Sequence, residues 1–449
     1  MQNLRAEILK ALLRVEAGSY SNLLLDSELK KIKDQRDKNL FTEIFYGVIR
    51  NKIYLDYIID KFSKTQLDKM DKEVLMGLRI GVYQLFFLDK VPARAAIYES
   101  VEAVKIILPA SKKGAVSFTN GILRNINRKK DSIKLPLEEK NPEKYLSVRY
   151  SYPLWLVRRF IKQYGLDKSK MILKAGNKRA EVIYRHNSLK MSEDKFLELL
   201  AEDNVEYEKT FLESFYRLKK VNNPAETEVF KKGAAYIQGT SAGLASLLLD
   251  PKENMELLDL ACAPGGKTSH LAALMKNTGS IRALDISQQR LDLTRGNFER
   301  LGVKNVELIK ADSAEYKDDH KYDRILADLP CSGLGLIASK PEIKWDKDQS
   351  VIKKMAALQY DILTNNLDKL KVGGQLLYST CTLTKEENQD LIKRILAEND
   401  DFELIDINQK LEKVSSLNLD NKNKYLELLP GEVDSEGFFY ALLKKAESD

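Results

Sequence analysis

The sequence predicts a multidomain protein that begins with an all-α bundle, continues with a small α+β domain and ends with a doubly wound α/β domain. Its 449 residues exceed the usual size of one domain, which is about 100 to 200 residues. Apolar residues recur at helical spacing as far as about residue 128, whereas apolar strands alternate with helical segments after residue 236. We therefore expect two or three hydrophobic cores.

The all-α bundle is expected over residues 1–130. Ala6, Leu9, Leu12 and Leu13 lie three or four positions apart, as on the buried face of a helix, and the sequence between Pro92 and Pro109 predicts one amphipathic helix. Residues 131–150 are charged and contain two prolines, which favours a linker.

The small α+β domain is expected over residues 151–235 and the α/β domain over 236–449. In the first, residues 180–187 and 205–210 read as strands, and residues 192–203 as a helix capped by Ser192. In the second, six apolar strands separated by helical segments are expected at residues 255–260, 280–287, 306–312, 322–330, 373–381 and 438–445.

The net charge of +7 is unevenly distributed. Residues 1–240 hold 45 Lys and Arg against 31 Asp and Glu, and residues 241–449 hold 28 against 35. The basic half is expected to face a polyanion, with its densest cluster at residues 124–130, although a lysine excess is also common on a solvated surface. Charge alone leaves nucleic-acid binding open.

Composition also indicates the compartment. No segment approaches the roughly 18 to 20 unbroken apolar residues that cross a bilayer, and the first residues lack the apolar region of a signal peptide. Only three cysteines occur, Cys262, Cys331 and Cys381, which argues against a disulfide framework. We expect a cytoplasmic protein with reduced thiols, no membrane partner and no metal site.

A glycine turn follows the first strand of the α/β domain, where the sequence reads DLACAPGGK from Asp259 to Lys267. Gly265 and Gly266 would let a ligand approach the backbone at a helix N-terminus, although a Gly-Gly pair often makes only a tight turn. Asp285 ends the next strand about 20 residues later, where a carboxylate commonly binds ribose hydroxyls, and Asp312 follows the third strand. The spacing matches neither GxGxxG nor a P-loop, so an adenosyl ligand without phosphates fits better.

Two cysteines follow neighbouring strands. Cys331 comes three residues after Asp328, and Cys381 ends the strand at residues 373–381. A buried cysteine is more often inert packing, but two thiols at one sheet edge beside an aspartate suit nucleophilic catalysis. Carbon 5 of cytosine becomes nucleophilic only after a thiolate adds at carbon 6, and a carboxyl group near the base would stabilise the charge that develops. The base must first leave its stack.

These residues resemble the cytosine-C5 RNA methyltransferases. The resemblance rests on PGGKT at 264–268, DLPCSGLG at 328–335, KPEIKW at 340–345, YSTCTLTKEEN at 378–388 and LLPGEVDSEGFFYA at 428–441. Segments of the N-terminal part, TEIFYGVIRNKIYLD, LRIGVYQLFFLDKVPARAAIYESVE and FTNGILRNI, are similar to the NusB-like extension of the bacterial 16S ribosomal RNA enzymes of the Sun/Fmu (RsmB) type. The resemblance covers essentially the whole chain.

The resemblance implies a NusB-like bundle, a small mixed domain and a Rossmann-like methyltransferase domain that uses S-adenosyl-L-methionine. It implies methylation at the site that the family numbers cytosine 967 of 16S ribosomal RNA, by a monomer that does not act on DNA. Cys381 would be the nucleophile, Cys331 would assist release and Asp328 would contact the base. The implied cofactor contacts are Ala261, Cys262, Ala263, Pro264, Gly265, Gly266, Lys267, Asp285, Asp312 and Asp328.

Two positions depart from the family pattern. Cys262 stands one place later than the family's cysteine, so we interpret its side chain as packing. Ala338 and Ser339 replace two arginines that often precede KPEIKW, which puts one phosphate contact in doubt. The role of Lys267 stays open. The alternatives are the same chemistry on another RNA or on a protein side chain, and a non-catalytic RNA-binding protein.

Overall fold

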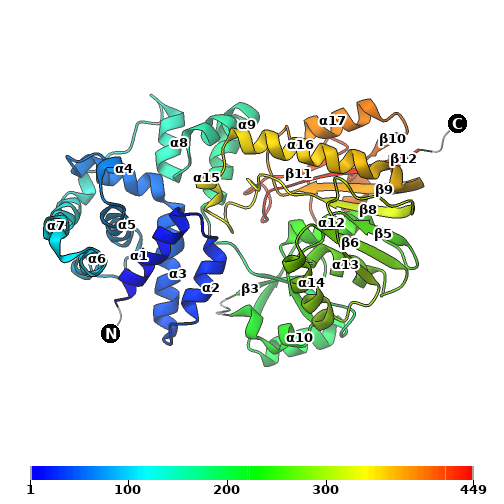
Figure 1. Ribbon diagram of the computed structural model, residues 1–449, viewed down its shortest axis with the longest axis horizontal. Helices are drawn as coiled ribbons and strands as arrows, with labels where there is room; N and C mark the ends of the chain where they lie inside the picture. The colour runs from blue at the N-terminus through cyan, green and yellow to red at the C-terminus, as the bar shows by residue number, and fades with distance from the viewer. Residues whose placement is uncertain (1–2, 220, 222, 420, 447–449) are drawn as a thin grey trace. The chain divides into compact units, whose positions relative to one another are not determined.

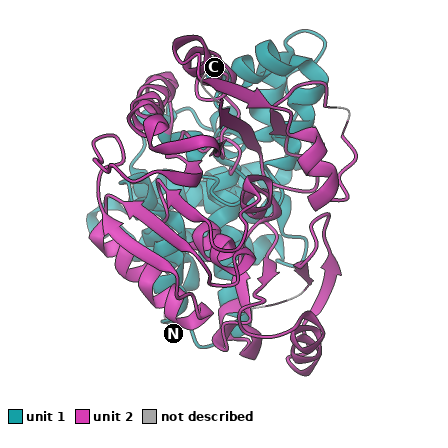
Figure 2. Cartoon of the chain, turned by 90° about the vertical axis from the view of Figure 1, so that its right-hand side faces the viewer, with its two compact units in different colours: residues 1–178, 337–346 teal, residues 179–336, 347–449 magenta. Residues whose placement is uncertain are grey.

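The computed structural model describes residues 3–219, 221, 223–419 and 421–446. The chain divides into two compact units (Figure 2). The first holds residues 1–178 together with 337–346, and the second holds 179–336 together with 347–449. Across the described residues, no helix is long and apolar enough to span a membrane.

The first unit is all-α, as the sequence predicts. Its longer helices are α1 (Leu4–Glu16), α2 (Ser21–Leu29), α3 (Gln35–Arg50), α4 (Lys52–Phe62), α5 (Lys72–Phe87), α6 (Ala93–Ile107), α7 (Lys113–Arg128), α8 (Pro142–Tyr150) and α9 (Leu154–Ala175). Helix α5 is apolar around most of its circumference and packs against α1, α3, α4, α6 and α7, so it forms the centre of the bundle (Figure 1). The predicted helix between Pro92 and Pro109 is α6. The second half of the expected linker, residues 142–150, is helix α8.

A short segment from the C-terminal half of the sequence completes this unit. Residues 337–346, which include the helical turn α15 (Ile343–Asp346), leave the second unit after Leu336 and return to it at Lys347. The Lys344 ammonium is buried and donates hydrogen bonds to the carbonyl oxygens of Arg50 at 3.0 Å and Ser151 at 3.1 Å, and to Asn177 Oδ1 at 2.7 Å. The whole KPEIKW motif at residues 340–345 therefore belongs to the helical unit.

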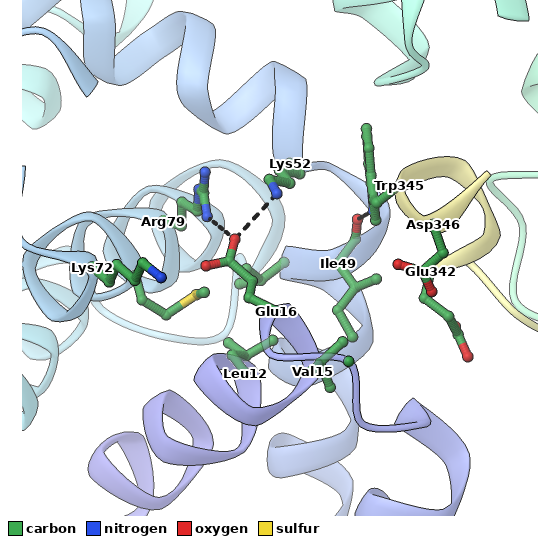
Figure 3. A pocket seen from close by; sticks show the side chains of 13 residues that line it. Leu12, Val15, Glu16, Ile49, Lys52, Lys72, Arg79, Glu342, Trp345 and Asp346 are labelled. Atoms are coloured by element: carbon green, nitrogen blue, oxygen red, sulfur yellow. Dashed lines mark hydrogen bonds and ion pairs between the residues drawn. The ribbon is translucent and has the colours of Figure 1, made fainter. Parts of the chain in front are cut away.

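A cavity of about 340 Å³ lies in the first unit between α1, α3, α5 and α15 (Figure 3). Glu16 points toward two cations there, with its Oε1 2.7 Å from Arg79 Nη1 and 3.1 Å from Lys52 Nζ. Arg79 also pairs with Asp56 at 2.7 Å. Glu16, Lys52, Arg79 and Asp56 therefore neutralise one another's charges beside the cavity.

The second unit contains a small antiparallel sheet with the strand order β2 (Glu206–Lys209), β3 (Phe215–Lys219), β1 (Ile183–His186) and β4 (Ala235–Ile237). Helix α10 (Glu193–Glu202) begins after Ser192, whose hydroxyl accepts a hydrogen bond from Lys195 N. The predicted strands and the predicted N-cap are confirmed.

The larger sheet of the second unit has the order β10, β12, β9, β8, β5, β6, β7 (Figure 1). The strands are β5 (Glu256–Asp259), β6 (Ser280–Asp285), β7 (Val306–Lys310), β8 (Tyr322–Asp328), β9 (Leu370–Thr380), β10 (Phe402–Ile405) and β12 (Phe438–Lys445), with β11 (Leu426–Leu428) paired to β12. Strands β5 to β9 are mutually parallel, whereas β12 runs antiparallel to β9. The mixed α/β fold is confirmed.

Alternate residues of these strands enter opposite cores. Leu257 and Leu326 pack with α12 (Thr240–Leu249) and α13 (Gly266–Leu274) on one face, and Leu258 and Ile325 pack with α16 (Gln349–Asn366) and α17 (Gln389–Glu398) on the other. The strand order reverses between β5 and β8, because the chain first builds outward to β7 and then returns. Ligands in such sheets bind at the carboxyl ends of the strands beside this reversal.

Candidate active site

The glycine turn connects β5 to α13 at this edge. Gly265 has a φ of 92°, which other residues adopt only with strain, and a side chain there would lie 2.7 Å from the Phe298 ring. Asp259 is buried below the turn, where its carboxylate accepts hydrogen bonds from Thr268 Oγ1 at 2.6 Å and Ala261 N at 3.2 Å. Burial raises the pKa of Asp259 to about 6. The aspartate therefore shapes the turn from inside the fold.

A buried arginine supports the same turn from the small sheet. Arg185 of β1 donates hydrogen bonds to the Gly266 carbonyl at 2.6 Å, to Gln238 Oε1 at 2.7 Å and to Ser269 Oγ at 3.0 Å. Burial lowers the pKa of Arg185 to about 9. The sequence reasoning missed this residue, because nothing in the strand IYRH indicates that its arginine points inward.

Asp285 ends β6, next to β5, and its side chain is buried. One carboxylate oxygen accepts from Ser287 N at 2.9 Å, and the other lies 3.1 Å from Arg290 Nη1. Ile286 beside it is 63% exposed. Asp312 follows β7 and is exposed, with Oδ1 accepting from Ala314 N at 2.9 Å.

Lys267 and Asp328 form an ion pair at the point of strand reversal, with Nζ 2.7 Å from Oδ2. The second oxygen of Asp328 accepts from Ser379 Oγ of β9 at 2.8 Å, so the carboxylate joins three elements. Although burial opposes it, the carboxylate of Asp328 raises the pKa of Lys267, which keeps the ammonium charged. The lysine whose role the sequence left open therefore contacts the aspartate.

The two cysteines lie together. Cys331 Sγ and Cys381 Sγ are 3.2 Å apart, and both residues are half-buried. Their loops are joined by a hydrogen bond from Gly335 N to the Cys381 carbonyl at 2.9 Å. The contact with Cys381, together with burial, raises the pKa of the Cys331 thiol well above its usual range. Cys262, in contrast, is buried in a small apolar cluster with Ala283 and Leu291.

The structure thus brings one set of sequence-predicted residues to a single edge. The carboxyl ends of parallel strands carry, in sheet order, Cys381 after β9, Asp328 and Cys331 after β8, the glycine turn and Lys267 after β5, Asp285 after β6 and Asp312 after β7. This edge carries the thiol pair after β8 and β9, and the carboxylates of Asp285 and Asp312 after β6 and β7.

Comparison with known proteins identifies the family. Residues 246–444 match the model described as 16S rRNA methyltransferase RsmB/F, residues 2–128 match the NusB family, and residues 152–220 match the RsmF/B-like ferredoxin-like domain. The chain is 36% identical over 447 residues to the probable ribosomal RNA small subunit methyltransferase B of Bacillus subtilis, which covers 97% of each chain. The family is decided by this match over the full length. The chain belongs to the RsmB-type 16S rRNA methyltransferases.

Other relatives of this RsmB-type chain agree. The ribosomal RNA small subunit methyltransferase B of Shewanella oneidensis is 32% identical over 448 residues and covers 99% of each chain. A crystal structure of the protein called PH0851 superimposes with a TM-score of 0.82 at 27% identity, covering 99% of this chain and 98% of that one. The RsmB-type chain is an RNA cytosine-C5 methyltransferase with the fold of S-adenosylmethionine-dependent enzymes.

Proposed function

We propose that this protein methylates carbon 5 of one cytosine in 16S ribosomal RNA, the site that the family numbers 967, through a covalent adduct on Cys381. The observation that carries the proposal is the pair of thiols 3.2 Å apart beside the Lys267–Asp328 ion pair. One thiol of such a pair attacks the base, while the other assists when the adduct breaks down.

Cys381 is the proposed nucleophile because the Lys267 ammonium interacts favourably with its thiolate. Its sulfur bonds to carbon 6 of cytosine, and electron density moves to carbon 5 and toward nitrogen 3. A proton held between the Asp328 carboxyl group and nitrogen 3 moves to nitrogen 3 and neutralises the negative charge that develops there, and the carboxylate that remains is stabilised by Lys267 and Ser379. Carbon 5 then carries the nucleophilic electron pair.

Release reverses the addition. A proton acceptor removes the proton from carbon 5. The double bond between carbon 5 and carbon 6 then forms again, and the bond from carbon 6 to Cys381 Sγ breaks. The Cys331 thiol, 3.2 Å away and protonated at neutral pH, donates a hydrogen bond to the departing thiolate. Cys331 therefore assists release without bonding to the base.

S-adenosyl-L-methionine supplies the methyl group when bound, and the residues at the sheet edge fit it. The buried carboxylate of Asp285 suits the two ribose hydroxyls, and the exposed Ile286 offers an apolar surface to adenine. The other contacts that we propose are residues 261–267, Asp312 and Asp328, with Cys262 contributing only its backbone.

We also propose the domain division 1–130, 131–150, 151–235 and 236–449. The basic N-terminal half serves as the RNA-binding surface, because lysine and arginine side chains neutralise phosphates. Acting on ribosomal RNA, the protein is expected in the cytoplasm and as a monomer.

Incubation of the protein with methyl-labelled cofactor and unmodified 16S ribosomal RNA, followed by mapping of the labelled base, tests the proposal. Label is expected at one cytosine, the family site. The Cys381→Ala variant is expected to bind the cofactor with unchanged affinity and to transfer no label. Label on another RNA only, or full turnover by that variant, would overturn the proposal.

A further inference from the structure

A fully buried carboxylate lies between the two cysteine loops and has no role in the steps above. Glu387 stands between β9 and α17, and its side chain is completely inaccessible. Among the described residues, no lysine or arginine forms an ion pair with it, so its charge is stabilised only by hydrogen bonds. An ionised group buried in this way is costly unless its position serves a purpose.

Glu387 fixes the loop that carries Cys331. Its Oε1 accepts from Ser332 N at 2.7 Å, and its Oε2 accepts from Ser332 Oγ at 2.5 Å. On the other side of the cysteine, Gln359 of α16 donates to the Pro330 carbonyl at 2.8 Å and to Glu387 Oε1 at 3.2 Å. Both neighbours of Cys331 are therefore held by one connected network.

The same network fixes the loop that carries Cys381. Thr384 Oγ1 donates to Glu387 Oε2 at 2.7 Å, and Thr382 Oγ1 lies 2.6 Å from Ser332 Oγ and 3.4 Å from that carboxylate oxygen. Asn388, the next residue, accepts from Thr380 Oγ1 at 2.6 Å and donates to the Thr382 carbonyl at 3.0 Å. Residues on both sides of each cysteine thus depend on Glu387 and Asn388.

The charges around the thiols differ in sign. Glu387 adds its negative charge on the side of Cys331 and disfavours a thiolate there, after the larger effects of the contact with Cys381 and of burial. The Lys267 ammonium interacts with the Cys381 thiolate. Among the described residues, Tyr378 of β9 faces Cys331 and Tyr440 of β12 faces Cys381, while Asp328 of β8 pairs with Lys267. Glu387 combines hydrogen bonds to both loops with a negative charge near Cys331.

We propose that Glu387 is the positioning residue that holds the two cysteine loops in register and keeps the proton on Cys331, so that Cys381 carries the negative charge. The catalytic role of Glu387 rests on the proposed function, in which Cys381 attacks the base and Cys331 assists release. Ionisation of one of two thiols 3.2 Å apart opposes ionisation of the other, so a fixed charge nearby decides which one loses its proton first.

The pH dependence of alkylation tests this assignment without any methyl transfer. The full-length protein is treated with limiting iodoacetamide from pH 6 to pH 10, and each cysteine is followed by peptide mass spectrometry. In the unaltered protein, Cys381 is expected to react at a lower pH midpoint than Cys331. In Glu387→Gln, the midpoint of Cys331 is expected to fall by about one pH unit, because a neighbouring like charge of this kind shifts a pKa by that order.

Glu387→Asp keeps the charge but withdraws it from the two loops by one methylene, so it is expected to lower the Cys331 midpoint measurably, though by less than Glu387→Gln does. Glu403→Gln, which removes an exposed carboxylate on β10, is the matched control and is expected to change nothing. An unchanged Cys331 midpoint in a folded Glu387→Gln would overturn the proposal. If that variant does not fold, Glu387→Asp decides: a midpoint identical to that of the unaltered protein would overturn it.

Turnover gives the second measurement. Glu387→Gln is expected to lower kcat for 16S ribosomal RNA at least tenfold while KM for the cofactor stays within about twofold, and Glu387→Asp is expected to restore part of kcat. If Glu387→Gln lowers the Cys331 midpoint but leaves kcat unchanged, Glu387 has no role in catalysis, and that part of the proposal is overturned. If Cys381→Ala retains methyl transfer, the proposed covalent mechanism is wrong. The alkylation midpoints still test whether Glu387 keeps the proton on Cys331, because they do not depend on methyl transfer.

Discussion

The Lys267 ammonium lies 2.7 Å from Asp328 Oδ2, and this ion pair connects the cofactor turn to the cysteine loops. Lys267 is the second residue of α13, directly after the two glycines, whereas Asp328 ends β8 three residues before Cys331. Both side chains are largely buried, and the ammonium also lies 5.3 Å from the centre of the Phe438 ring. A single charge thus interacts with Asp328, the proposed base contact, and with Cys381, the proposed nucleophile.

Lys267→Met removes that charge while keeping a side chain of similar length. We expect kcat to fall by about 10² to 10³, the usual loss when one preorganised electrostatic group is removed. Cofactor affinity, measured by calorimetry, is expected to fall less than kcat does, because Lys267 is only one of several proposed cofactor contacts. Lys276→Met, at an exposed lysine after the same helix, serves as the control. Normal kcat in the Lys267 variant would remove the ion pair from the mechanism.

Cys331→Ala is expected to accumulate a covalent complex between protein and RNA, because release loses its assisting thiol while attack by Cys381 continues. The complex would appear as a retarded band in a denaturing gel after incubation with 16S ribosomal RNA and cofactor. The double variant Cys331→Ala with Cys381→Ala should show no such band. A band in the double variant would show that another residue attacks the base.

Asp285→Ala is expected to weaken binding of S-adenosylhomocysteine by roughly 10 to 100-fold, since hydrogen bonds to a charged group contribute about 1.5 to 3 kcal/mol each. Calorimetry measures this loss directly. Asp292→Ala, an exposed aspartate on the helix that follows, is the matched control. Equal affinity in the two variants would place the ribose elsewhere.

His270 predicts a pH dependence of stability. Burial, and then the charge of Arg185, lowers the pKa of His270 well below its unfolded value of about 6.5. The folded state therefore keeps this histidine neutral, so its contribution is full above pH 6.5 and is lost as the pH falls through and below that value. The pKa of Asp259 is raised from 3.8 to about 6 in the folded protein, so its contribution to the free energy of unfolding is present at low pH and is lost as the pH rises through 6. Between these two pKa values Asp259 therefore changes stability in the direction opposite to His270.

Comparison of the unaltered protein with His270→Gln separates the contribution of His270 from that of Asp259, because Asp259 is present in both proteins. The difference in free energy of unfolding between this variant and the unaltered protein is expected to change by about 1.4 kcal/mol per pH unit below pH 6.5. Urea unfolding at pH 7.0, 6.0 and 5.5 measures it. A difference that does not depend on pH would mean that His270 titrates normally in the folded protein.

Local sequence patterns determined the order of elements and the residues at the sheet edge. Helical spacing predicted the bundle, and Ser192 predicted the N-cap of α10. Apolar strands that end at Asp259, Asp285 and Asp328 predicted one catalytic edge, because parallel strands end on the same side. These features depend on a few neighbouring residues, so the sequence by itself contains them.

The tertiary structure decided the partners of the charged side chains. Lys267 meets Asp328 across 61 residues, Arg185 meets Gly266 across 81, and Glu387 meets Ser332 across 55. Likewise, residues 337–346 join the helical unit although their sequence neighbours do not. Such pairings follow from strand order and from which face of an element is buried, and both are set by packing between segments that no local pattern connects.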